Sequence, residues 1–304
     1  MSPVPHLYTL TGNLLAERTL EFTDWEIGRT QRAVGEVFHT RGKGINVSNM
    51  LTRLGAPNTA LFFAGGAPGA ESEAWLRRRG IAFQAFATQA PSRTGTVIWS
   101  GARPETTFLG PDVAPDAAAL TACAAWLDGV PAGQVLALCG SFPGWSGAAF
   151  APVRGAIERW LQRGEVVADA YGPPLAWLAH YPLSLVKINR QEFDAFAPPA
   201  APGFSLPERL RQIRAAHPVR NWIVTDGAAS IWLAPQSGDP LEFQPPRLKE
   251  VSPTGSGDVF LACLLQAHCQ QGRSLPDAIR HALPYAAANA AHPGVADFPL
   301  PLAL

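Results

Sequence analysis

Short apolar runs alternate with longer mixed runs along most of the chain, beginning at about residue 56. The apolar runs occupy residues 59–63, 135–139, 165–168, 183–188 and 222–225. They resemble strands that are buried on both faces of a parallel sheet. The longer runs end at Gly, Pro or polar turns and predict helices at about 68–80, 115–129, 147–163, 172–180 and 206–216. This repeated order predicts an α/β fold with a doubly wound, mostly parallel sheet flanked by helices.

Two stretches depart from this order. Residues 17–40 and 93–109 alternate apolar with polar or Thr residues and contain no helical run. Such alternation predicts a small antiparallel sheet with one solvated face, attached beside the main domain as a lid or an interface. We therefore expect residues 1–304 to form a single domain that carries a β lid.

The composition favours a small molecule as the ligand. The 304 residues are 47% hydrophobic and 16% charged, which excludes general disorder. Lys plus Arg and Asp plus Glu both number 24, so the charge gives no reason to expect nucleic acid or an anionic membrane as a partner. The four Cys residues lack a metal-binding spacing, and no apolar run is long enough to cross a membrane. We expect a cytoplasmic protein.

The most informative motif is a small-residue turn directly before an apolar helical run. Gly255, Ser256 and Gly257 leave backbone N–H groups open to an anion at the positive end of the helix that they begin. Asp258 follows in the first turn, where we expect it to be held ionised and to take a proton from a substrate hydroxyl. The alternative is an acidic residue that only stabilises a helix N-terminus.

A second glycine-rich loop lies near the N-terminus. Gly42 and Gly44 permit a close backbone approach, and the helix that they begin carries Lys43 at its start and Asn46 one turn later. This pattern predicts a site for an anion and a hydroxyl group. Lys43 is not followed by the Ser or Thr of a P-loop, and neither motif has the third Gly of a dinucleotide fingerprint. An ordinary loop with a solvated lysine is the alternative.

Two further motifs follow predicted strands. Asn189 and Glu192 are three residues apart where a helix begins, and they could orient water around Mg²⁺. A helix N-cap with a capping Glu explains the same spacing. Ser141 lies in the turn of residues 140–144, which either belongs to the site or is merely structural.

The order and spacing of these motifs resemble those of the ribokinase-like (PfkB-type) carbohydrate kinases, and within them the branch of 1-phosphofructokinases and tagatose-6-phosphate kinases. The resemblance covers nearly the whole chain. Residues 9–17 resemble the opening strand, 42–47 the sugar loop, and 105–108 the second lid strand. Ser92 and Arg93 stand where a Thr-Arg pair reaches a substrate phosphate. The remaining matches are 140–144 with G-S-L-P-x-G, 187–192 with K-P-N-x-x-E, 224–227 with the strand that meets nucleotide phosphates, and 254–258 with T-G-A-G-D.

The resemblance implies a ribokinase-like fold and ATP-dependent, in-line phosphoryl transfer to a hydroxyl of a phosphorylated hexose, with Mg²⁺. It implies Asp258 as the base, the Gly255-Ser256-Gly257 turn as the anion hole, and a homodimer formed through the lid. The residues implied in substrate binding are Asn13, Glu17, Arg41, Gly42, Lys43, Asn46, Arg93 and Ser141. Those implied at the ATP site are Lys187, Asn189, Thr225, Gly227 and Asn289, with Asn189 and Glu192 holding the metal through water.

Three residues depart from the family pattern. Glu17 replaces an Asp that binds sugar hydroxyls, Arg41 replaces the first Gly of the sugar loop, and Ile188 replaces the Pro of K-P-N. We expect Glu17 and Arg41 to act together. They either pair across the cleft or divide contacts to an atypical, more oxidised or differently phosphorylated sugar, because Arg suits bidentate recognition of carboxylate and phosphate.

Other functions compete with this hypothesis. One is a ribokinase-like kinase of a free sugar or nucleoside, against which Lys43 and Arg93 argue. Another is a catalytically silent sugar-phosphate sensor on the same fold, which the altered Glu17 and Arg41 favour. The retained Asp258 argues against a sensor, because binding alone needs no base. A nicotinamide dehydrogenase is disfavoured by the missing fingerprint.

Overall fold

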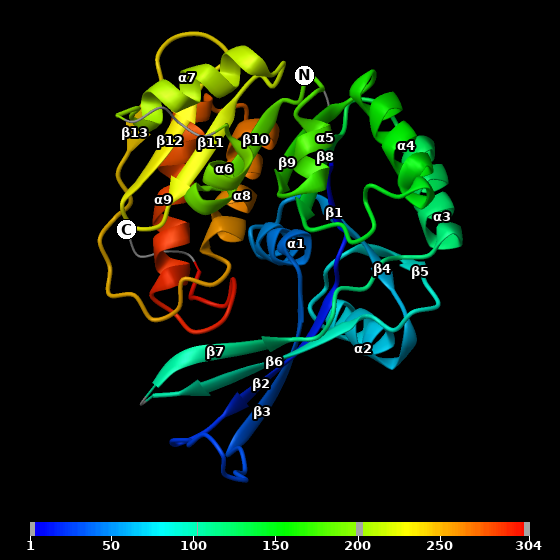
Figure 1. The fold of residues 1–304 in the computed structure, drawn as a ribbon, viewed down its shortest axis with the longest axis vertical. Helices are drawn as coiled ribbons and strands as arrows, with labels where there is room; N and C mark the ends of the chain where they lie inside the picture. The colour runs from blue at the N-terminus through cyan, green and yellow to red at the C-terminus, as the bar shows by residue number, and fades with distance from the viewer. Residues whose placement is uncertain (1–3, 102, 199–202, 301–304) are drawn as a thin grey trace.

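The computed structural model describes residues 4–101, 103–198 and 203–300. Nine strands of this part form one sheet in the order β13-β12-β11-β10-β9-β8-β1-β4-β5 (Figure 1). Neighbours from β5 to β11 are parallel, and the edge pairs β11–β12 and β12–β13 are antiparallel. The strands that follow β1 in sequence lie on both of its sides, with β4 on one side and β8 on the other. Open α/β sheets bind ligands at such a reversal of strand order. The strands are β1 (Leu7–Thr11), β4 (Asn58–Ala64), β5 (Phe83–Ala87), β8 (Val135–Gly140), β9 (Glu165–Ala170), β10 (Leu185–Asn189), β11 (Trp222–Asp226), β12 (Ser230–Ala234) and β13 (Leu241–Phe243).

Alternate residues of the central strands face two hydrophobic cores. Leu136 and Leu138 of β8 face the core formed with α3 to α7, whereas Ala137 and Cys139 face the core formed with α1, α8 and α9. A short third core lies between α2 and β4. The helices are α1 (Lys43–Arg53), α2 (Gly66–Arg78), α3 (Ala117–Gly129), α4 (Ala151–Leu161), α5 (Pro173–Leu178), α6 (Arg190–Phe196), α7 (Leu206–Ala216), α8 (Ser256–Leu265) and α9 (Leu275–Ala290), with short turns η1 (Ala148–Phe150) and η2 (Gln266–Gln270).

The predicted central strands and the predicted helices are present. The helix expected at 147–163 is divided into η1 and α4, and α5 is shorter than expected. β5 and the β12–β13 hairpin were not predicted, because they are short strands at or next to the edges of the sheet, where full burial is not required. None of the helices in the described ranges has the length and apolar character that a membrane crossing requires.

A second sheet, which we call the lid, projects from the main domain (Figure 1). Its strands are β2 (Leu15–Glu21), β3 (Gly35–Arg41), β6 (Arg93–Ser100) and β7 (Arg103–Leu109), in the order β3-β2-β6-β7. The outer pairs are antiparallel, as expected for the lid, and the central pair β2–β6 is parallel. Both central strands follow a strand of the main sheet and therefore leave it in the same direction. The predicted opening strand, residues 9–17, is divided between β1 and β2.

Candidate active site

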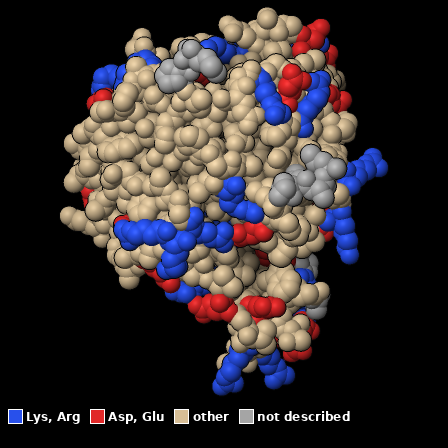
Figure 2. Space-filling model, turned by 180° about the vertical axis from the view of Figure 1, so that it is seen from behind, with Lys and Arg blue, Asp and Glu red and all other residues tan. Residues whose placement is uncertain are grey.

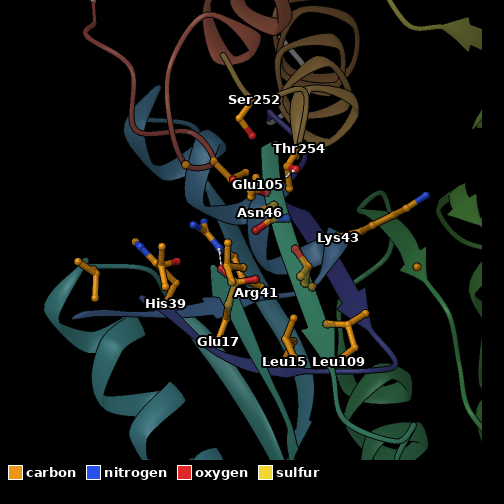
Figure 3. Close-up of a pocket in the computed structure, with 18 of the residues that line it drawn as sticks. Leu15, Glu17, His39, Arg41, Lys43, Asn46, Glu105, Leu109, Ser252 and Thr254 are labelled. Atoms are coloured by element: carbon orange, nitrogen blue, oxygen red, sulfur yellow. Dashed lines mark hydrogen bonds and ion pairs between the residues drawn. The ribbon is translucent and has the colours of Figure 1, made fainter. Parts of the chain in front are cut away.

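Two cavities meet where the parallel strands have their carboxyl ends. The first cavity has a volume of about 630 Å³ and lies between the lid and the main domain (Figure 3). The second cavity, of about 600 Å³, lies beside the N-terminal end of α8 and one face of α9. Lys43 lines both cavities. The two cavities are therefore adjacent compartments of one site.

The structure brings together nearly all residues that the sequence singled out. The residues expected to bind the substrate all line the first cavity: Asn13, Glu17, Arg41, Gly42, Lys43, Asn46, Arg93 and Ser141. The turn and most residues expected at the nucleotide line the second cavity: Lys187, Asn189, Thr225, Gly227, Gly255, Ser256, Gly257 and Asp258. Asn289 and Glu192 line neither cavity among the described residues.

Asn289 corrects the expectation that it lines the nucleotide cavity. It is fully buried, and its Nδ2 donates to the Thr254 carbonyl at 2.9 Å and to Ser256 Oγ at 3.0 Å. Its Oδ1 accepts from the Ala296 N–H at 2.7 Å. Successive helical residues point about 100° apart, so other residues of α9 line the cavity: Leu283, Ala286, Ala287 and Ala290. Asn289 instead stabilises the turn before α8 through the two hydrogen bonds that its Nδ2 donates.

The turn before α8 requires glycine at its first position. Gly255 has a φ of +75°, in the left-handed region that favours glycine. A Cβ at this position would lie 2.2 Å from Val295 Cγ1, so space as well as backbone conformation excludes a side chain. In the first turn of α8, the Ser256 and Asp258 N–H groups donate to the Pro253 and Gly255 carbonyls at 3.2 Å and 3.0 Å. Among the described residues, this leaves the N–H of Gly257, which lines the second cavity, without a partner. This arrangement can bind an anion such as a phosphoryl group.

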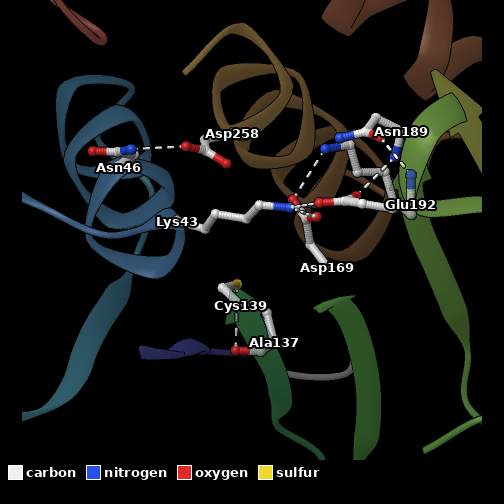
Figure 4. A network of polar contacts seen from close by, with 9 residues as sticks. Lys43, Asn46, Ala137, Cys139, Asp169, Asn189, Glu192 and Asp258 are labelled. Atoms are coloured by element: carbon white, nitrogen blue, oxygen red, sulfur yellow. Dashed lines mark hydrogen bonds and ion pairs between the residues drawn. The ribbon is translucent and has the colours of Figure 1, made fainter. Parts of the chain in front are cut away.

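Asp258 lies in the first turn of α8 and is buried. Its Oδ2 accepts a hydrogen bond from Asn46 Nδ2 at 2.7 Å (Figure 4). Burial, followed by the nearby Asp169 carboxylate, raises the pKa of Asp258 to about 6, against the opposing effects of Lys43 and Lys187. The expectation that the helix N-terminus holds Asp258 ionised did not take this burial into account. A carboxyl group with a pKa of about 6 is still about nine-tenths ionised at pH 7, so it can accept a proton.

A buried carboxylate that the sequence did not single out joins the two lysines. Asp169, at the end of β9, accepts from Lys43 Nζ at 2.9 Å and from Lys187 Nζ at 3.0 Å (Figure 4). Burial alone would raise the pKa of Asp169, but the ammonium groups of Lys187 and Lys43 outweigh it and lower the pKa. Burial likewise opposes the charge of Lys43, yet Asp169, Glu192 and Asp258 raise the pKa of Lys43. Lys43 is therefore held charged, and Lys187 shares its buried carboxylate partner beside the turn.

Asn189 and Glu192 form a capping box at the start of α6. Asn189 Oδ1 accepts from the Glu192 N–H at 2.8 Å, and Glu192 Oε2 accepts from the Asn189 N–H at 2.9 Å. Glu192 Oε1 accepts from Lys43 Nζ at 2.8 Å. Among the residues described, no group of three or more His, Cys, Asp or Glu side chains is arranged to hold a metal. The carboxylate oxygens of Asp169 and Glu192 already accept from Lys43, Lys187 and the Asn189 N–H, so these side chains could hold Mg²⁺ only through water.

The lid side of the first cavity carries a second polar network. Asn13 Nδ2 donates to Asp112 Oδ1 at 2.8 Å and to Ser141 Oγ at 3.2 Å, and Arg93 Nη1 donates to the same Asp112 oxygen at 2.8 Å. Asn13 Oδ1 and Arg93 Nε are buried and have no hydrogen-bond partner within the described part of the chain. Buried groups are normally satisfied, so this network is incompletely hydrogen-bonded. Sequence reasoning missed Asp112, a lone acidic residue in a loop.

Glu17 and Arg41 form a buried ion pair in the wall of the first cavity. Arg41 Nε lies 3.1 Å from Glu17 Oε1, and the two side chains are 8% and 11% exposed (Figure 3). Glu17 lies on β2 and Arg41 on β3, strands that pair directly. Of the two arrangements expected, the structure has the direct pair.

Comparison with known proteins agrees with this geometry. The family model of the pfkB family carbohydrate kinases matches residues 17–302. The D-tagatose-1-phosphate kinase of Bacillus licheniformis is 26% identical, over 96% of this chain and 94% of the relative. The 1-phosphofructokinase of Borreliella burgdorferi is 25% identical, with the same coverage of 96% and 94%.

Solved structures show the same fold. Phosphofructokinase-2 of Escherichia coli in complex with fructose-6-phosphate has a TM-score of 0.85 at 20% identity, covering 94% of each chain. The ribokinase of Thermotoga maritima has a TM-score of 0.73 at 16% identity, covering 97% of this chain and 96% of that one. The expected ribokinase-like fold is confirmed.

Proposed function

The chain belongs to the pfkB family of carbohydrate kinases, and we propose that it transfers the γ-phosphoryl group of ATP to a hydroxyl of a phosphorylated hexose. The class that we propose is that of fructose 1-phosphate and the tagatose phosphates. Relatives named D-tagatose-1-phosphate kinase and 1-phosphofructokinase support this choice. In this proposal the first cavity holds the sugar phosphate and the second cavity holds the nucleotide.

The position of Asp258 carries the proposal. Asp258 lines the second cavity, and its hydrogen-bond partner Asn46 lines the first. A base at this boundary can take the proton of a sugar hydroxyl while the hydroxyl oxygen attacks a phosphoryl group held at the turn. The proton moves to the carboxylate, the new O–P bond forms, and the bond to the leaving ADP breaks. A pKa of about 6 lets the carboxyl group release that proton to water at neutral pH.

Two lysines stabilise the charge on the transferring group. Lys43 and Lys187 are both held by Asp169 beside the turn that begins at Gly255. Negative charge spreads over the oxygens of a transferring phosphoryl group, and fixed cations and N–H donors stabilise it there. Mg²⁺, bound through water at Asn189 and Glu192, would supply further positive charge to the nucleotide phosphates.

Arg93 is the best candidate to bind the phosphate of the substrate. Each Arg and Lys among the described residues of the first cavity already has a carboxylate partner. The partners of Arg41 and Lys43 are buried, whereas Asp112, the partner of Arg93, is 58% exposed. An exposed carboxylate that is displaced stays hydrated, so the exchange costs little. Arg93 lines the first cavity, and the planar guanidinium group of an Arg suits bidentate contact with a phosphate.

We also propose a homodimer formed through the lid. Val37 and Leu109 of the lid line the first cavity, yet each is 54% exposed. A second copy of the chain would cover these apolar side chains and close the open side of the cavity. Gel filtration with light scattering should give the mass of a dimer, and Val37→Glu with Leu109→Glu should give a monomer.

A screen for ATP consumption tests the proposed reaction. The acceptors are fructose 1-phosphate, fructose 6-phosphate, tagatose 1-phosphate, tagatose 6-phosphate and their free sugars. We expect turnover with a phosphorylated hexose, and a loss of about 10²–10⁴ in kcat for Asp258→Asn with ATP binding retained. Binding of sugar phosphates without ATP consumption would support a silent sensor. Faster turnover of free sugars would support the free-sugar kinase.

A further inference from the structure

The Glu17–Arg41 pair leaves hydrogen-bonding atoms open to the first cavity. The pair uses Nε of Arg41 and Oε1 of Glu17. No described residue pairs with Nη1 or Nη2 of Arg41 or with Oε2 of Glu17, and none of these atoms is sealed from solvent without a partner. Both residues line the cavity, and Arg41 Nη2 lies near Gly294 of the opposite wall. The pair therefore presents donors and an acceptor side by side.

The pair itself carries no net charge, and the Glu21 and Glu105 carboxylates also line this cavity. Glu17 balances Arg41 at 3.1 Å. His39, on the same face of β3, stays neutral at pH 7, because burial and then Arg41 lower the pKa of His39 to about 4. Asp297, on the opposite wall, is paired with Arg79 at 2.7 Å. An anionic group placed beside the pair would be attracted by the Arg41 guanidinium group but repelled by the adjacent Glu17 carboxylate.

A neutral group with adjacent oxygens meets no such conflict. A hydroxyl can donate to Glu17 Oε2 while a neighbouring hydroxyl or carbonyl oxygen accepts from an Nη of Arg41. Because both side chains are about nine-tenths buried and hold each other, these atoms are fixed before the sugar enters. A carboxylate could accept from the same Nη of Arg41, but its negative charge would then lie beside the Glu17 carboxylate, and the repulsion between like charges opposes its binding.

We propose that the Glu17–Arg41 pair is a specificity element that binds two adjacent neutral oxygens of the sugar and rejects a carboxylate at that position. The inference rests on the proposed function, since it assigns the substrate's carbon chain to the first cavity. It narrows the substrates to phosphorylated ketoses, aldoses and polyols, and excludes phosphorylated aldonic acids. This differs from the expected alternative in which Glu17 and Arg41 divide their contacts to a more oxidised sugar.

Calorimetric titration with two matched ligands tests this element directly. Sorbitol 6-phosphate and 6-phosphogluconate differ only in whether the terminal carbon is a hydroxymethyl or a carboxylate group. For the unmodified protein we expect the acid to bind about tenfold or more weakly than the polyol. Glu17→Gln keeps the shape of the side chain but frees the charge of Arg41, so it should favour the acid by about 10- to 100-fold relative to the polyol.

Two further variants separate the pair from the general charge of the cavity. Glu21→Gln removes the same charge from the same strand and cavity, four residues away, and should leave the ratio of the two affinities unchanged. Arg41→Met leaves Glu17 uncompensated and should weaken both ligands, the acid more.

The outcomes distinguish this inference from the proposed function. Equal binding of both ligands to the unmodified protein, or a ratio that Glu17→Gln does not move, would overturn the inference even if ATP-dependent turnover is found. The expected ratios without turnover of any sugar phosphate would uphold the element and refute the kinase reaction. If neither ligand binds, the inference is wrong, and the proposed function is decided by the ATP-consumption screen alone.

Discussion

Replacing Gly257 by Ala tests whether the position of Lys187 controls phosphoryl transfer. Gly257 has no positive φ, so Ala meets no backbone strain there. A Cβ on Gly257 would lie 2.8 Å from Lys187 Nζ and 3.7 Å from Lys187 Cε. Both atoms belong to the flexible end of a side chain, so the ammonium group would move and the helix would stay.

We expect Gly257→Ala to lower kcat strongly and to change the free energy of unfolding only slightly. Lys187 is 3% exposed and its Nζ lies 3.0 Å from Asp169 Oδ2, so it cannot move far without losing this bond. A hydrogen bond to a charged group contributes about 1.5–3 kcal/mol, which is about 10- to 150-fold in kcat if the transferring group loses the contact. Gly→Ala at an unstrained position stabilises the fold by about 0.4–1 kcal/mol. We therefore expect a slow enzyme whose free energy of unfolding is nearly unchanged.

A matched glycine provides the control. Gly155 lies inside α4, and a Cβ there would lie 3.2 Å from Arg159 Nη1, again the end of a flexible cation. Gly155 lines neither cavity, so Gly155→Ala should leave kcat unchanged. The assays are ATP consumption for kcat and urea unfolding for stability. An unchanged kcat in folded Gly257→Ala would refute the role given to Lys187.

Three other predictions follow from the site. Because Asp258 must be ionised to act as a base and its pKa is raised to about 6, kcat/KM should fall about tenfold per pH unit below pH 6 and level off above it; a flat profile down to pH 5 would contradict this. Arg93→Met should weaken binding of a phosphorylated sugar about 10- to 150-fold more than that of its free counterpart, and equal losses would argue against phosphate recognition. Asn289→Asp removes the donor to the turn and should lower kcat about tenfold, with KM changed less than about threefold. Asn58→Asp, at another buried Asn, should cost similar stability, about 1–3 kcal/mol, and leave kcat intact.

Much of the fold was predictable because burial leaves a strong local pattern. The central strands β8 to β11 are covered on both faces, so their sequences are continuously apolar. The edge strands β5 and β13 lack that constraint and were missed. The parallel pairing of β2 with β6 also has no local signal, because it depends on where the preceding strands lie.

The residues of the candidate site, too, were predictable only where they leave a local pattern in the sequence. Gly255 and Gly42 stand out because the backbone requires glycine in a recognisable turn. Asp169 and Asp112 are single carboxylates whose partners are distant in the sequence, so only the folded chain reveals them. Sequence spacing placed Asn289 near the nucleotide but could not predict the direction of its side chain. The next residue of the helix, Ala290, lines the second cavity, whereas Asn289 donates to the turn.

The lining of the first cavity has a consequence for synthesis of the protein. Its wall includes Thr11 at the end of β1 and Asp297 near the last described residues, so it contains both the earliest and the latest parts of that region to leave the ribosome. The main sheet up to β13 can assemble before residues 293–297 are made. A growing chain therefore has no complete first cavity, and sugar phosphate can stabilise the protein only after translation of that segment. Added substrate should protect a chain that includes residues 293–297 from proteolysis, but should not rescue a chain that ends at residue 292.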